Sequence, residues 1–335
     1  MTVGAALLLY AAILGALGPL AHRRDGWLTR APRLGATLLL AAAWSVLTAL
    51  FLAGLTVALP GTALSSGLSD LLGACILRLR AAYVTPGGAA VAGAGLMLSG
   101  AIAARVGWAC IRVVRARRAE RRRQRSLVAL CGRPTSTLDA VILDQPQPAA
   151  YCLAGREKTV VLTSGALTLL TRPQLAAVLA HEQAHLGARH HRLLAAAALA
   201  GRALPELPLM RHLPDQVRRL VEMHADELAA CTQDPETLAT ALVALATARS
   251  GLPSAPTAAL AAADSDTAVR IRRLLLPPAT LTPRRRRTIR AAVAAFALIP
   301  VLVALTPAAV AANQPPVKQR QAVTVTIVGH DSGRR

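Results

Sequence analysis

Long apolar runs occupy the first third of the chain and recur near its end. At 1.5 Å per residue in a helix, each is long enough to cross the roughly 30 Å hydrocarbon core of a bilayer. The runs cover residues 1–21, 34–59, 88–114 and 291–312. This pattern predicts four transmembrane helices, three before the central region and one after it.

The central region, residues 126–283, has shorter periods of apolar and polar positions. Runs rich in valine, leucine and threonine, bounded by proline, glycine or polar residues, predict short strands at residues 137–144, 150–153 and 158–163. Apolar positions at helical spacing predict most of the rest to be helix. The expected helices cover residues 164–170, 173–187, 192–203, 217–231, 236–249 and 265–276. The region is therefore expected to be an α+β domain with more helices than strands.

The charges orient this arrangement. Residues 112–125 contain eight arginines and one glutamate, and residues 22–33 contain four arginines. Because cytoplasmic loops are enriched in Lys and Arg, both segments are expected to be cytoplasmic, and the 126–283 domain with them. The amino terminus, a loop at residues 60–87 and a short tail at residues 313–335 are then expected outside.

Composition agrees with a membrane protein. Apolar residues make up 54% of the chain, aromatic residues only 2%, and the mean hydropathy is +0.44. The net charge of +21 suggests nucleic-acid binding, but the arginines cluster beside apolar runs as membrane anchors do, so we expect no direct nucleic-acid contact. The five cysteines are scattered without a CxxC pair, which predicts neither a disulfide framework nor a thiolate zinc site.

One stretch of the central region carries a metal-binding pattern. The sequence His-Glu-Gln-Ala-His at residues 181–185 is an HExxH motif in an alanine-rich run that reads as helix. Two histidines four residues apart lie on one helix face, where both imidazoles can reach one metal ion, most naturally zinc. Glu182 lies close enough to take a proton from a metal-activated water without being a ligand. The motif predicts zinc ligands at His181 and His185 and a general base at Glu182.

A second helical motif, Glu-Met-His-Ala-Asp at residues 222–226, follows about 40 residues later. Glu222 and Asp226 are one turn apart and share a face, with the small Ala225 beside them. A catalytic zinc typically has three protein ligands and a water molecule. We therefore expect Glu222 to be the third ligand and Asp226 to orient a ligand histidine by accepting its other ring N–H.

A rival third ligand is His191, six residues after His185. The metzincin pattern HExxHxxGxxH places its third histidine at that offset. It also requires a glycine three residues after the second histidine, where this chain has Ala188 and the glycine comes one position early, at Gly187. We favour Glu222 over His191 for this reason.

These motifs, together with residues 150–165, resemble the gluzincin-type peptidase unit shared by HtpX-like proteases and the BlaR/MecR membrane receptors. Three spans before the unit and one after it are similar to BlaR/MecR. The resemblance implies a multi-pass protein with a cytoplasmic zincin-like (gluzincin) metallopeptidase domain. It also implies zinc ligands at His181, His185 and Glu222, catalysis by Glu182, and an orienting role for Asp226.

In that family the cytoplasmic zinc domain responds to an external signal and acts on a repressor. The resemblance thus implies a protein of the bacterial plasma membrane with a BlaI/MecI-type repressor as partner. The 23 residues after the last span are too few for a penicillin-binding sensor, so we expect a form without a sensor. An HtpX-like quality-control protease is the alternative.

The expected reaction is hydrolysis of a peptide bond by a zinc-activated water, with the substrate paired along an exposed strand edge at residues 150–153. The oxyanion-stabilising residue stays open among Tyr151, His190, His212 and Arg219. A non-catalytic membrane signalling protein with a structural zinc is a further alternative. The presence of Glu182 argues against it, because a structural site needs no base.

Overall fold

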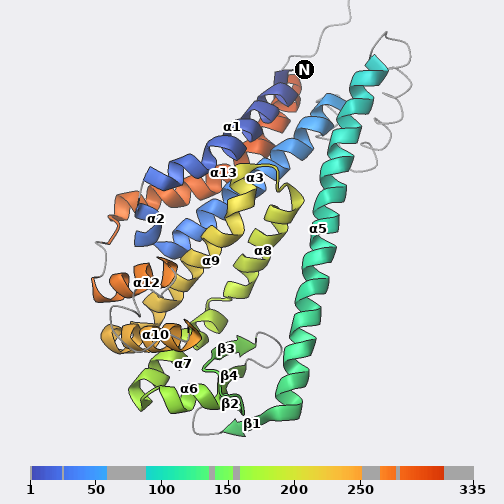
Figure 1. Cartoon of the computed structure of the whole chain (residues 1–335). Helices are drawn as coiled ribbons and strands as arrows, with labels where there is room; N and C mark the ends of the chain where they lie inside the picture. The colour runs from blue at the N-terminus through green and yellow to red at the C-terminus, as the bar shows by residue number, and fades with distance from the viewer. Residues whose placement is uncertain are drawn as a thin grey trace, which may run out of the picture.

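The computed structural model describes residues 2–24, 26–58, 88–135, 140–153, 159–250, 265–276 and 280–312. Most of them are helical, and a small sheet lies at one end (Figure 1). The helices are α1 (Thr2–Arg24), α2 (Trp27–Arg30), α3 (Pro32–Ala58), α5 (Gly88–Cys131), α6 (Ser164–Leu169), α7 (Arg172–Gly187), α8 (His190–Ala203), α9 (Pro208–Ala229), α10 (Pro235–Ser250), α12 (Ser265–Leu275) and α13 (Pro283–Ala312). The strands are β1 (Gly132–Thr135), β2 (Ala140–Leu143), β3 (Ala150–Leu153) and β4 (Thr159–Thr163).

Three helices in the described residues are long and apolar enough to cross a membrane, namely Pro32–Ala58, Gly88–Cys131 and Pro283–Thr306. They overlap three of the four predicted spans, at residues 34–59, 88–114 and 291–312. The first predicted span forms α1, but the apolar part found there, Val3–Ala16, is shorter. The predicted outer loop at residues 60–87 and the tail at residues 313–335 lie outside the described residues.

Helix α3 is the centre of the apolar bundle. It packs against α1, α5 and α13, and α1 and α13 lie along it in Figure 1. The contact with α5 is close because both helices carry small residues there: a Cβ on Gly54 would lie 2.5 Å from the carbonyl oxygen of Gly95. Ser99 of α5 also donates a hydrogen bond of 2.8 Å to the carbonyl of Phe51.

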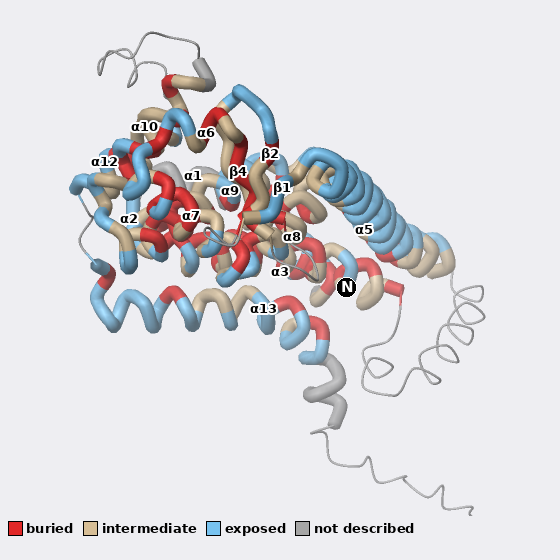
Figure 2. The backbone as a smooth tube through the Cα atoms, turned by 90° about the horizontal axis from the view of Figure 1, so that it is seen from below, coloured by how far each residue is buried: buried red, intermediate tan, exposed pale blue. Residues whose placement is uncertain are grey.

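Helix α5 continues past its predicted end at residue 114 without a break to Cys131. Its second half carries the arginine-rich segment down to the sheet, as Figure 1 shows. This half is mainly exposed, and Figure 2 shows the helix as largely pale blue. The expected domain boundary at residue 126 therefore falls inside a helix.

The sheet has the strand order β1-β2-β4-β3. Strands β2 and β4 are parallel, and the other two pairs are antiparallel. Sequence patterns predicted β2, β3 and β4 but not β1, whose Gly-Arg-Pro-Thr sequence has no apolar alternation. Strand β3 pairs only with β4 in the described sheet and forms its edge, as the predicted substrate-binding strand must. Helix α7 packs Leu175, Val178 and Leu179 against β4.

Helices α8 and α9 form a hairpin that packs against the apolar helices. Residues of this hairpin, such as Ala200 and Val217, share one buried cluster with Ala43 and Val46 of α3. At its tip Glu206 accepts a hydrogen bond of 2.6 Å from Arg105 of α5, which gives the one charge inside the apolar half of α5 a partner. Part of the 126–283 region thus shares its core with the helices of membrane length.

Candidate metal centre

Helix α7 begins at a capping box. The Thr171 side chain accepts from the backbone N–H of Gln174, and the Gln174 side chain accepts from the backbone N–H of Thr171. The helix ends after Gly187, and Arg189, with φ 55°, turns the chain into α8. Between these ends the 3.6-residue repeat places His181 and His185 one turn apart on the same face.

Helix α9 crosses α7 and brings the second motif to these histidines. The Nε2 atoms of His181 and His185 lie 3.1 Å apart, and Glu222 oxygens lie 3.5 Å from the first and 3.6 Å from the second. Ligand atoms bound at about 2.0–2.1 Å in a tetrahedral site are separated by about 3.4 Å. The spacing and the donor set of two imidazoles and a carboxylate therefore fit a zinc ion.

The other residue of the α9 motif faces His181 from the far side of the ring. Asp226 Oδ1 lies 3.0 Å from Nδ1 of His181, at ion-pair distance although the angle falls short of a hydrogen bond. This is the position from which a carboxylate fixes the orientation of a ligand imidazole. The structure thus places Asp226 where the motif predicted it.

Arg270 of α12 was not predicted. Its guanidinium makes two hydrogen bonds to Asp226, of 2.7 and 2.8 Å, and an ion pair of 3.2 Å with Glu222. The Arg270 side chain is only 13% exposed, so the pairing is little screened by solvent. It holds both α9 carboxylates in place. No local pattern predicts this role, because many arginines of this chain stand in similar helical patterns.

The charges of the candidate metal centre are set by these contacts. Burial alone would raise the pKa of both carboxyl groups, but His181 and Arg270 hold the pKa of Glu222 at about 2 and that of Asp226 at about 2. Burial likewise lowers the pKa of the His181 imidazole, but Asp226 and Glu222 outweigh it and raise the pKa to about 9. Burial lowers the pKa of His185 to about 4.

A further pair of histidines supports His185. Nδ1 of His190 lies 3.1 Å from Nδ1 of His185, and Nε2 of His190 lies 2.8 Å from Nδ1 of His224. Both are buried, and burial lowers the pKa of His190 to about 3, so its ring is neutral and able to orient His185. His190 was one of the oxyanion candidates, and the structure places it against the ring of His185, a predicted ligand.

Glu182 lies beside the three converging side chains in a cavity of about 130 Å³. Ala150 of the edge strand β3 and residues of α10 form other walls of this cavity. Burial raises the pKa of the Glu182 carboxyl, and the nearby His181 opposes part of that rise. The site therefore combines a partly buried carboxyl, a metal-binding triad and a strand edge.

The rival ligand lies elsewhere. His191 faces α5, where it borders a small cavity with Arg117 and Arg121, and Arg117 donates to its backbone carbonyl. Among the described residues the group able to hold a metal ion is His181, His185 and Glu222. Of the remaining oxyanion candidates, Arg219 is paired with Asp266 at 3.1 Å, and neither Tyr151 nor His212 borders the cavity of Glu182.

Zinc binding should release about one proton per chain at pH 6. At that pH His181 carries a proton, because its pKa is about 9, whereas His185 and Glu222 do not. The proton must leave before Nε2 can bind the metal, so the His181 contribution should disappear as the pH rises through 9, where only the proton lost by the zinc-bound water remains. Titration calorimetry in buffers of different ionisation enthalpy measures this number. Asp226→Asn should release less, since Asp226 raises the His181 pKa; equal release by both proteins would contradict the assignment.

The fold and the site define a mostly helical protein that has helices of membrane length, a small sheet and, on two packed helices, a group of two histidines and one glutamate able to hold a metal ion. A family model, Peptidase family M48, matches residues 115–320, which is more than half of the chain. The chain belongs to this family and is thus a metallopeptidase, a hydrolase of peptide bonds. No curated protein and no solved structure matches the chain.

Proposed function

We propose that this protein is an integral-membrane zinc metalloendopeptidase that uses Glu182 as its general base. The observation that supports this proposal most directly is the convergence of His181, His185 and Glu222 at tetrahedral spacing beside Glu182. Two histidines and a glutamate are a donor set that catalytic zinc sites use, with the fourth position left for water or substrate.

In the proposed reaction, a zinc ion held by His181, His185 and Glu222 would lower the pKa of a water molecule to about 7 and would polarise the scissile carbonyl. Glu182 accepts the proton of that water and returns it to the leaving amine. The burial of Glu182 suits this proton exchange, because burial raises the pKa of the carboxyl toward neutral pH. Asp226, Arg270 and His190 keep the ligands oriented. The substrate lies extended along the free edge of β3.

The membrane placement follows from the apolar helices and the arginines at their ends. We propose a cytoplasmic catalytic centre, because the basic half of α5 and the arginines before residue 291 lie on the same side of the apolar runs as that centre. Reporter fusions after residues 25 and 200 should therefore be cytoplasmic, and one near residue 70 external. A cytoplasmic report from residue 70 with an external one from residue 200 would reverse the orientation.

For the substrate we propose a cytoplasmic transcriptional repressor of the BlaI/MecI type, as in BlaR/MecR signalling. The likeness of the arrangement of apolar runs and motifs to those receptors supports this choice. The alternative, an HtpX-like quality-control protease, has the same site chemistry and differs only in its substrates.

Comparing the proteome of cells with the active enzyme and with its Glu182→Gln variant tests the proposal. We expect one small DNA-binding protein to be cleaved only in the presence of the active enzyme, at a defined bond. If misfolded membrane proteins were the only substrates, the quality-control function would replace the regulatory one. If no cleavage depended on Glu182, the peptidase assignment itself would fail.

A further inference from the structure

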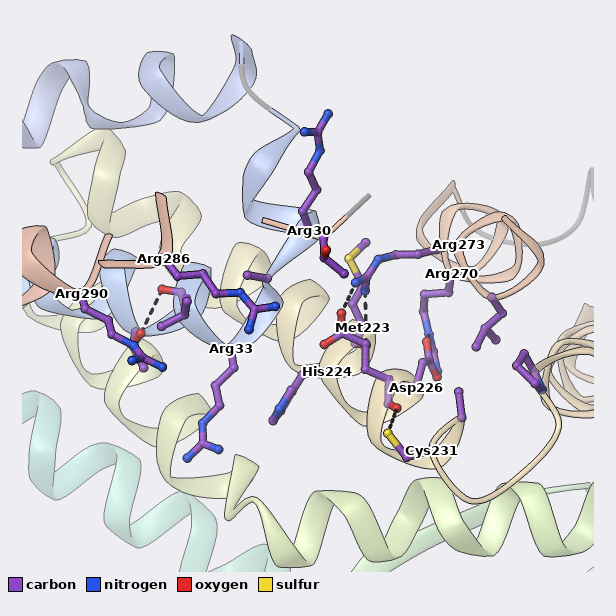
Figure 3. A pocket seen from close by; sticks show the side chains of 18 residues that line it. Arg30, Arg33, Met223, His224, Asp226, Cys231, Arg270, Arg273, Arg286 and Arg290 are labelled. Atoms are coloured by element: carbon purple, nitrogen blue, oxygen red, sulfur yellow. Dashed lines mark hydrogen bonds and ion pairs between the residues drawn. The ribbon is translucent and has the colours of Figure 1, made fainter. Parts of the chain in front are cut away.

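A second, larger cavity lies behind the metal centre. It has a volume of about 620 Å³ and is bounded by the start of α3, the end of α9, helix α12 and the start of α13. Asp226 and Arg270 form the wall that it shares with the metal centre. Figure 3 shows this cavity, hereafter the arginine pocket, with arginine side chains on both sides of His224 and Met223.

Positive charge exceeds negative charge in the arginine pocket. Six arginines line it, against the two carboxylates Asp226 and Glu227. Those two carboxylates are already paired, Asp226 with Arg270 and Glu227 with Arg273. The guanidinium groups of the remaining arginines have no hydrogen-bond acceptor or ion-pair partner within the part of the chain that the structure describes. These arginines are Arg30, Arg33, Arg286 and Arg290.

The backbone adds to the positive electrostatic potential of the arginine pocket. Helices α3 and α13 both begin at the pocket, and neither has an acidic residue in its first turn. A helix amino terminus carries a partial positive charge, which acidic residues normally balance. Here Arg33 and Arg286, which both line the pocket, stand in those first turns instead. The helix ends and the arginines repel one another unless an anion lies between them.

The pocket also has an apolar side, to which Leu34, Met223 and Leu274 contribute. Arg33 and Arg290 are the last charged residues before uncharged runs of membrane length, residues 34–58 and 291–312. A molecule held here thus meets guanidinium groups at one end and lies next to the start of the apolar helices at the other. Basic pockets in this position between transmembrane helices suit anionic lipid headgroups.

We propose that the arginine pocket binds the phosphate of an anionic phospholipid headgroup, with Arg33, Arg286 and Arg290 as the main contacts. Guanidinium groups bind phosphate oxygens by paired, charge-assisted hydrogen bonds. The acyl chains extend along α3 and α13 into the bilayer. This inference rests on the proposed membrane placement, but it needs neither zinc nor peptidase activity.

The test uses the purified full-length protein in detergent micelles with added phosphatidylglycerol, phosphatidylcholine or inorganic phosphate. Native mass spectrometry should show one bound phosphatidylglycerol and no comparable binding of phosphatidylcholine. Arg286→Gln with Arg290→Gln should weaken phosphatidylglycerol binding by roughly tenfold to thirtyfold, since each arginine near an anionic headgroup contributes about fivefold in affinity. The matched control, Arg284→Gln with Arg287→Gln, removes the same charge from the same helix outside the pocket and should stay within about twofold of the parent.

Three results would overturn the proposal: equal losses in both double variants, which indicate general surface attraction; equal binding of phosphatidylcholine; and saturation by inorganic phosphate at the same concentration as lipid, which indicates a site for a free anion. Zinc content and cleavage of a model peptide are measured on the same samples. If the parent protein bound lipid but had no peptidase activity, that result would count against the proposed function and not against the lipid site.

Discussion

Glu182→Gln should abolish most turnover while leaving zinc bound. The amide has nearly the same shape as the carboxyl but cannot accept a proton from the water, and a positioned general base contributes about 10²–10⁴ in rate. Glu182 is not among the three converging ligand residues, so the metal contacts of His181, His185 and Glu222 stay. We expect a fall in kcat of roughly a hundredfold or more and close to one zinc per chain.

Metal analysis and cleavage of a model peptide on the same preparation separate the two effects. Loss of zinc together with activity would make Glu182 a structural residue of the centre. Full activity in the variant would end the proposed mechanism. A matched control is Gln183→Glu, an exposed neighbour on α7 that should leave both readouts near those of the parent.

Glu222→Ala should lose both metal and activity. It removes the one carboxylate that lies within 3.6 Å of both histidines, so two imidazoles alone remain to hold the ion. Since disturbing a residue that only orients a ligand costs about tenfold to a hundredfold in affinity, loss of a ligand should cost roughly a hundredfold or more. Activity should fall in proportion to the zinc lost.

His191→Ala is the matched variant for this experiment. His191 lies against α5 beside Arg117 and Arg121, so its removal should leave zinc near one equivalent. Zinc titration measures the zinc content and affinity of both variants, and circular dichroism verifies that each is folded. Retention of zinc by the Glu222 variant and loss by the His191 variant would assign the third ligand to His191. The zinc content of Asp226→Asn should fall between those of the other two variants. This change leaves all three ligands in place but removes the carboxylate that orients the His181 ring.

The parts of the site that could be predicted lie within single helices. The HExxH motif predicts which side chains share a face of α7, and the second motif predicts which side chains share a face of α9. Both predictions are possible because the 3.6-residue repeat of a helix is a local property. Long apolar runs could be assigned equally well, since they need only length and composition. Strand β1 was missed because Gly132 to Thr135 has no pattern of its own and becomes a strand by pairing with β2.

Arg270 and His190 illustrate what could not be predicted. Arg270 lies 44 residues beyond Asp226, and nothing in its neighbourhood distinguishes it from other helical arginines. His190 adjoins His191 in sequence, yet one ring packs under His185 and the other faces α5. The left-handed conformation of Arg189 sets the direction of α8 and thereby decides which of the two histidines faces the metal centre.

The two motifs, their helices and the apolar runs could be read from the amino-acid sequence alone, since each depends on residues close together in the chain. Three contacts become visible only in the folded chain. Glu222 of α9 lies within 3.6 Å of both α7 histidines, Arg270 joins Glu222 to Asp226, and the α8–α9 hairpin packs on α3. The tertiary structure also gathers arginines from the starts of α3 and α13 and from α12 around one cavity. These contacts depend on how buried faces of distant helices fit together, which a local pattern of residues does not contain.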